Sequence, residues 1–147
     1  MGTLRVTGSR SVQTHSEEDT AAVGRDLAAT LTAGDVLLLH GDLGAGKTAF
    51  VRGLAEGLGI PRDDVSSPTF TLIQEYRGGR LPLFHVDLYR IDDPREFDEL
   101  GLDEIAEEGV LAIEWADKLP AVPRHAIRVT IAYVGESHRA IAVDSTT

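Results

Sequence analysis

Residues Gly41–Thr48 read GDLGAGKT and match the phosphate-binding pattern G-x-x-x-x-G-K-[ST] at every fixed position. An apolar run at 36–40 precedes the motif, as expected of a buried parallel strand. The segment 48–58 has apolar residues at helical spacing, and Gly59 then supplies a stop signal. The glycine-rich loop therefore joins a strand to a helix, which is the context that a phosphate site requires.

The residue types in this loop indicate how it would bind a nucleotide. Glycines allow the backbone to fold around a phosphate with several N–H groups turned inward. The helix N-terminus adds its partial positive charge. We expect Lys47 to reach the β- and γ-phosphates and the Thr48 hydroxyl to bind Mg²⁺.

Composition limits the classes of function. The 147 residues are 42% hydrophobic and 26% charged, which predicts one globular domain over 1–147. A net charge of −10 argues against direct binding to DNA or to an anionic membrane. The absence of cysteine excludes disulfides, thiolate catalysis and Cys-ligated zinc. No apolar run approaches membrane-spanning length and no signal-peptide hydrophobic region is visible, so we expect a cytoplasmic location.

Local patterns predict an alternation of helices and strands. A helix should begin at Ser16 as N-cap, with acidic residues in its first turn, and end at Gly34. Residues 1–10 should be frayed or form an edge strand. Strands are expected at 71–76, 83–87, 110–113, 127–131 and 139–143, turns at 77–80 and 135–138, and short helices at 94–100 and 103–108. We therefore predict the α/β class: a single-domain P-loop NTPase with a mostly parallel central sheet, helices on both faces and added antiparallel strands.

Two of the predicted strands end in an acid, at Asp87 and at Glu114. Ligands bind at the carboxyl ends of strands in such sheets, and an ATPase needs a carboxylate on its Mg²⁺. Either acid could serve, and each could instead be an exposed loop residue. His85 shares a strand face with Asp87, and it is either a supporting residue or simply packed. No guanine-specific N-K-x-D motif is present, which favours ATP over GTP.

Four blocks in this order resemble the TsaE (formerly YjeE) family, and the resemblance covers roughly residues 12–143. The blocks are GDLGAGKT at 41–48, SPTFTL at 67–72, HVDLYR at 85–90 and IEW at 113–115. The family consists of bacterial P-loop ATPases of tRNA threonylcarbamoyladenosine synthesis. The resemblance implies that the partner is the TsaB–TsaD heterodimer, which modifies adenosine 37 of tRNAs that read codons starting with A. A family member hydrolyses ATP to sustain turnover and contacts tRNA only indirectly, which suits the acidic chain.

The resemblance also implies roles for individual residues. Lys47, Asp87 and Glu114 match the catalytic positions, and Thr48 and Glu114 match the Mg²⁺ ligands. Ser67 and Thr69 fall in a switch-like loop. The nucleotide-binding positions would be Glu17, Gly44, Ala45, Gly46, Lys47, Thr48, Ala49 and Arg139. The residues alone favour a simpler role for Glu17, in which its charge complements the helix dipole. Ala49 departs from the family, where threonine is frequent, but its backbone N–H remains.

Two other functions fit the phosphate loop. A small-molecule kinase would need an acceptor pocket and an arginine-bearing lid, for which Arg77 and Arg80 are the candidates. A non-catalytic regulatory nucleotide-binding protein would need only the loop itself. Product analysis and ATPase assays with and without a partner separate these alternatives.

Overall fold

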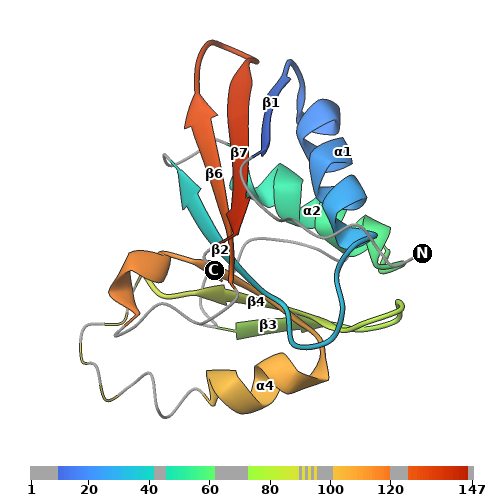
Figure 1. Ribbon diagram of the computed structural model, residues 1–147, viewed down its shortest axis with the longest axis vertical. Helices are drawn as coiled ribbons and strands as arrows, with labels where there is room; N and C mark the ends of the chain where they lie inside the picture. Colours follow the sequence, from blue (N-terminus) through green and yellow to red (C-terminus); the bar gives the residue numbers. More distant parts are fainter. Residues whose placement is uncertain are drawn as a thin grey trace.

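The computed structural model describes residues 10–41, 46–61, 73–89, 91, 93, 95, 101–119 and 126–145 (Figure 1). Helices and strands alternate along much of the chain. The elements are β1 (Arg10–Thr14), α1 (Glu17–Ala28), β2 (Val36–Gly41), α2 (Lys47–Gly57), β3 (Ile73–Tyr76), β4 (Leu83–Asp87), α4 (Leu102–Glu108), β5 (Val110–Glu114), the 3₁₀ helix η2 (Ala116–Lys118), β6 (Ile127–Tyr133) and β7 (Arg139–Ser145).

The strands form one mixed sheet in the order β1-β7-β6-β2-β5-β4-β3. Its four central strands, β6, β2, β5 and β4, run parallel to one another. Antiparallel pairing at β6–β7, β7–β1 and β4–β3 extends the sheet on both sides. The predicted α/β class is confirmed, with the parallel strands forming the core of the sheet.

Helices cover both faces of the sheet, as predicted, with α1 and α2 on one face and α4 on the other (Figure 1). The side chains of β2 alternate accordingly. Leu37 and Leu39 belong to the core beneath α1 and α2, whereas Val36 and Leu38 belong to the core beneath α4. A strand buried on both faces reads as a continuous apolar run, which explains the sequence of 36–40.

Helix α1 begins as predicted and ends earlier than predicted. The Ser16 side chain accepts a hydrogen bond from the Asp19 backbone N–H at the N-terminus. The helix ends at Ala28 and not at Gly34, because the Thr30 and Leu31 amides turn back to carbonyls only three residues earlier. The Arg80 guanidinium donates to the carbonyls of Ala28 and Leu31 and satisfies this C-terminus.

Other boundaries also differ from the sequence predictions. The sequence predicts a frayed segment or an edge strand at 1–10, whereas the described edge strand β1 covers 10–14, where Val12 packs against the core. Most of the predicted segment 1–10 and most of the predicted helix 94–100 lie outside the described residues. The hairpin turns at 77–80 and 135–138 are present, because β3–β4 and β6–β7 pair antiparallel around them.

Helices α1 and α2 meet backbone to backbone through glycines. A Cβ atom added at Gly53 of α2 would collide with the backbone carbonyl of Ala21 in α1. One added at Gly24 of α1 would likewise collide with the carbonyl of Phe50. These contacts leave no room for an added methyl group, because the atoms that it would meet belong to the backbone and cannot move aside as a side chain could.

We expect Gly53→Ala to destabilise the protein by about 1–3 kcal/mol, the cost of overpacking a close contact. At an exposed helix position the same change stabilises by roughly 0.5–1 kcal/mol, so the sign is diagnostic. Urea unfolding measures the change, with the exposed α1 variant Asp26→Ala as the control. A Gly53→Ala variant as stable as the wild type would contradict the backbone contact.

Candidate functional site

The phosphate motif lies between the end of β2 and the start of α2, as predicted. Gly46 is the N-cap of α2 with φ of 107°, a left-handed conformation that glycine adopts without a steric penalty. Its carbonyl accepts the Phe50 N–H and starts the helix. Lys47 and Thr48 then form the first turn of α2. Gly44 and Ala45 of the motif lie outside the described residues.

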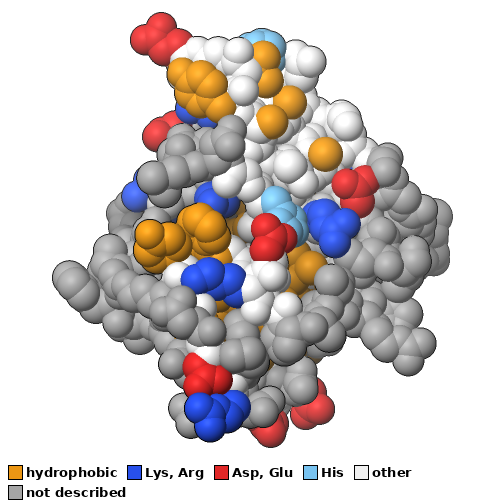
Figure 2. Space-filling view, turned by 90° about the vertical axis from the view of Figure 1, so that its left-hand side faces the viewer, with side chains coloured by type: hydrophobic (Ala, Val, Ile, Leu, Met, Phe, Trp, Pro, Cys, Tyr) orange, Lys and Arg blue, Asp and Glu red, His pale blue; other side chains and the backbone are white. Residues whose placement is uncertain are grey.

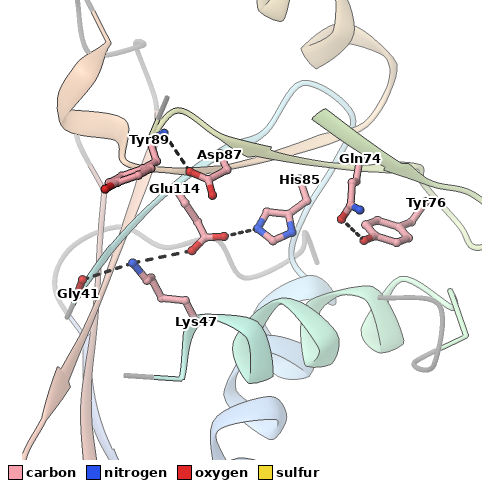
Figure 3. A network of polar contacts seen from close by, with 8 residues as sticks. All are labelled: Gly41, Lys47, Gln74, Tyr76, His85, Asp87, Tyr89 and Glu114. Atoms are coloured by element: carbon pink, nitrogen blue, oxygen red, sulfur yellow. Dashed lines mark hydrogen bonds and ion pairs between the residues drawn. The ribbon is translucent and has the colours of Figure 1, made fainter. Parts of the chain in front are cut away.

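Lys47 is directed toward an acid at the end of a neighbouring strand (Figure 3). Its Nζ lies 3.8 Å from Oε1 of Glu114 and donates to the Gly41 carbonyl at 3.3 Å. The other Glu114 oxygen, Oε2, lies 2.6 Å from Nε2 of His85. The His85 side chain is fully buried. The structure therefore joins the motif lysine, the acid of β5 and the histidine of β4 in one network.

This network keeps Glu114 ionised. Burial by itself raises the pKa of the Glu114 carboxyl, but the His85 hydrogen bond and charge and the nearby Lys47 outweigh it. The resulting pKa lies below the ordinary value of 4.5. A buried carboxylate that is ionised near neutral pH can accept a metal ion without first losing a proton.

Asp87 lies next to Glu114 because of the sheet register. The two residues are Cα partners in the parallel pairing of β4 with β5, and each ends its strand. The Asp87 Oδ1 accepts the Tyr89 backbone N–H at 2.9 Å, which fixes the side chain (Figure 3). Two carboxylates thus stand side by side at the carboxyl edge of the sheet, close to the start of α2.

A second group of predicted residues surrounds an open depression of ≈ 320 Å³. Glu17 from α1, Gly46 and Ala49 from α2, and Arg139 from β7 all line it. The Arg139 guanidinium lies 4.5 Å from the centre of the Tyr133 ring and donates to the Gly135 carbonyl at 2.9 Å. The remaining lining residues are Ser16, Thr20, Glu136 and Ser137. Four of the predicted nucleotide-binding positions, far apart in sequence, therefore meet in one place.

An exposed aromatic pair beside the lysine is a feature that the sequence analysis missed. Trp115 and Tyr89 are 41% and 58% exposed, and their ring centroids are 4.9 Å apart. Lys47 lies 5.8 Å from the centre of the Trp115 ring, and Lys118 lies 5.6 Å from that of Tyr89. Figure 2 shows hydrophobic side chains next to basic ones on this face. Trp115 has a positive φ of 61°, which the sequence pattern gives no means of predicting.

His40 lines a small cleft beside Trp115 and Lys47. The cleft has a volume of ≈ 120 Å³ and also includes Lys47, Trp115 and Asp117 in its lining. Burial lowers the pKa of His40 and nearby Arg128 and Lys47 reinforce this, although Asp117 opposes it. The imidazole is therefore neutral at pH 7 and adds no charge to the site.

The donor set fits Mg²⁺ better than a metal held by protein groups alone. Within the described ranges there is no group of three or more His, Cys, Asp or Glu side chains that could hold a metal. Mg²⁺ is usually bound by one or two carboxylates together with substrate phosphates and water. Glu114 and Asp87, together with Thr48 in the first turn of α2, could supply that kind of partial set. Ser67 and Thr69, the predicted switch residues, lie outside the described residues.

The chain is similar to known proteins of one family. The family model "Threonylcarbamoyl adenosine biosynthesis protein TsaE" matches residues 14–141. The TsaE protein of Bacillus subtilis is 47% identical over 131 residues, covering 88% of this chain and 81% of the relative. That of a Nostoc species is 48% identical over 128 residues, covering 84% of this chain and 78% of the relative.

The fold is also similar to a solved structure. The crystal structure of YdiB from Bacillus subtilis superimposes with a TM-score of 0.75 at 37% identity, covering 99% of this chain and 90% of that one. Among the described residues, no helix is long and apolar enough to cross a membrane. The chain belongs to the TsaE family of tRNA threonylcarbamoyladenosine biosynthesis proteins.

Proposed function

We propose that this protein is a Mg²⁺-dependent ATPase that binds the TsaB–TsaD heterodimer and drives its turnover. The pathway follows from the family, which acts in threonylcarbamoyladenosine biosynthesis. The ATPase activity, the partner, the metal and a cytoplasmic location are parts of the proposal. The heterodimer would modify adenosine 37 of tRNAs that read codons starting with A, and this chain would contact tRNA only indirectly.

The observation that carries the proposal is the convergence of Lys47, Asp87 and Glu114. The lysine begins α2 and the two acids end adjacent parallel strands, so all three reach the same edge of the sheet. Phosphoryl transfer depends on positioning and on charge stabilisation, and it needs a cation for the phosphates and a carboxylate for the metal. These three residues supply both.

Each residue would have a distinct task with ATP bound. Lys47 would exchange its contact with Glu114 for the β- and γ-phosphates. Glu114 and Thr48 would hold Mg²⁺, which neutralises charge on the phosphates during transfer. Asp87 would add the second carboxylate of the centre. The depression next to the start of α2, lined by Glu17 and Arg139, would hold the rest of the nucleotide.

The kinase alternative is weakened by the positions of its two arginines. Arg80 donates to carbonyls at the C-terminal end of α1, whereas Glu17 marks the opposite end, beside the depression. Arg77 pairs with Glu75 and with Glu108 of α4. Because both guanidinium groups are engaged away from the start of α2, neither forms a lid over it.

The decisive experiment combines this protein with purified TsaB, TsaD, tRNA and Mg²⁺-ATP. We expect phosphate release and the yield of modified adenosine to rise well above the values for this protein alone and for TsaB–TsaD alone. Parallel reactions without Mg²⁺ and with Lys47→Ala serve as controls. A phosphorylated small-molecule product would support a kinase. ATP binding without hydrolysis, in the presence of the partner, would support a regulatory nucleotide-binding protein.

The switch remains part of the proposal as a sequence-based prediction. Ser67 and Thr69 sit between α2 and β3 in the chain, where P-loop proteins often have a segment that responds to the γ-phosphate. A hydroxyl at Thr69 would give the two nucleotide states the differential contact that any switch needs.

A further inference from the structure

We infer that His85 is a positioning residue for Glu114. Its Nε2–H holds one carboxylate oxygen so that the other faces Lys47 and the phosphate end of the site. The inference rests on the ATPase function proposed above. It assigns a role to His85, which the sequence alone could not distinguish from a residue that is simply packed. His85 is fully buried, so it acts through Glu114 and not on the nucleotide.

The sheet register explains how the histidine reaches the acid. His85 on β4 is the Cα partner of Ala112 on β5, and Glu114 follows two residues later on the same face. In a parallel sheet the strands lie about 4.8 Å apart and two residues advance about 6.6 Å along a strand, so long side chains can span this diagonal. The contact of 2.6 Å therefore follows from where the two strands pair.

The two carboxylate oxygens of Glu114 are used differently. Oε2 accepts from Nε2 of His85, whereas Oε1 faces Lys47 at 3.8 Å. An ionised carboxylate only accepts hydrogen bonds, so the shared hydrogen is on Nε2 of the imidazole. Because one oxygen is anchored in the buried interior, rotation of the carboxylate is restricted. The other oxygen, Oε1, is thereby aimed at Lys47 and at the place where Mg²⁺ and phosphate would bind.

The other ring nitrogen argues against a purely structural role. Nδ1 of His85 is buried and has no hydrogen-bond partner among the described residues. Gln74, its Cα partner on β3, instead accepts a hydrogen bond from the Tyr76 hydroxyl (Figure 3). Leaving a buried polar atom unpaired costs free energy that an apolar residue would avoid. The contact with Glu114 is the one described polar contact of this side chain, and it accounts for a histidine here.

Two substitutions separate positioning from packing. The amide nitrogen of glutamine can take the place of Nε2, whereas that of asparagine lies near Nδ1 and is too far from Glu114. We expect His85→Gln to keep partner-stimulated kcat within about threefold of wild type. We expect His85→Asn to lower it about 10–100-fold, the range seen when an outer-shell partner of a metal ligand is lost. ATP affinity without Mg²⁺ should stay unchanged in both.

Three controls make the test specific. Phe84→Leu alters the neighbouring buried residue on the opposite face of β4, and it should lower stability without lowering kcat. His85→Leu replaces His85→Asn if the latter does not fold, because it fills the site without a donor. In a Glu114→Gln background, His85→Asn should lower kcat by less than about twofold, since its effect passes through the carboxylate.

A further readout does not depend on hydrolysis. Calorimetry of ADP with and without Mg²⁺ measures the affinity gained from the metal, which His85→Asn should reduce and His85→Gln should preserve. The inference is overturned if His85→Asn behaves like wild type, or if His85→Asn and His85→Gln lower kcat equally. It is also overturned if His85→Asn lowers kcat as much in the Glu114→Gln background as in the wild-type background. If wild type shows no partner-stimulated ATPase, the proposed function fails, and calorimetry still decides the role of His85.

Discussion

Replacing Lys47 with alanine is expected to weaken ATP binding by roughly 10–100-fold. The ammonium group lies at the start of α2 within 3.8 Å of Glu114, where it would neutralise phosphate charge. Loss of one charged hydrogen bond costs about 1.5–3 kcal/mol, and about 1.4 kcal/mol corresponds to a factor of ten in affinity. Isothermal titration calorimetry with Mg²⁺-ATP measures the change directly.

The chain offers a matched control, because Lys118 is its other lysine. The Lys118 ammonium also lies near the exposed aromatic pair, but it donates to the backbone carbonyls of Tyr89 and Ile91. Lys118→Ala should leave ATP affinity close to wild type. Equal loss in both variants would point to a general electrostatic effect. Unchanged affinity in Lys47→Ala would remove the assignment of the phosphate site.

The second large effect concerns the two adjacent carboxylates. We expect Asp87→Asn and Glu114→Gln each to lower partner-stimulated ATPase at least tenfold, and up to the 10²–10³-fold seen when one preorganised electrostatic group is lost. Each amide keeps an oxygen that can accept the existing hydrogen bond, from the Tyr89 N–H or from His85. Both variants should therefore fold, which circular dichroism and urea unfolding would verify.

Glu108→Gln is a suitable control for this pair. Glu108 is an exposed carboxylate at the end of α4, paired with Arg77, and it lies away from the start of α2. Its loss removes one negative charge without touching the site. If Asp87→Asn and Glu114→Gln hydrolyse ATP as fast as Glu108→Gln does with the partner present, these acids do not form the Mg²⁺ centre.

Features governed by local chemistry could be predicted from the sequence. The strand and helix around the motif, the Ser16 cap and the two hairpins all depend on residues within a few positions of one another. Asp87 and Glu114 could be placed at the same edge because parallel strands have a common direction. Those predictions needed no knowledge of which strands are neighbours.

Features that depend on register and on distant contacts could not be predicted. The bond from His85 to Glu114 joins residues 29 apart and requires that β4 pair with β5 at one particular offset. Trp115, which contacts Tyr89 with tilted rings, has a positive φ that an L-amino acid rarely adopts. The end of α1 is set partly by Arg80, which lies about fifty residues later in the chain.

The glycine contact between α1 and α2 fixes one wall of the depression that Glu17 and Arg139 line. Because carbonyl groups and not side chains set the spacing of the helices, no rotamer change can alter the distance between the two helix backbones where they meet. The opposite wall is the turn between β6 and β7, which carries Glu136 and Ser137 and has only a short hairpin behind it. One side of the depression is therefore set by backbone contact between two helices, and the other side is formed by a hairpin turn.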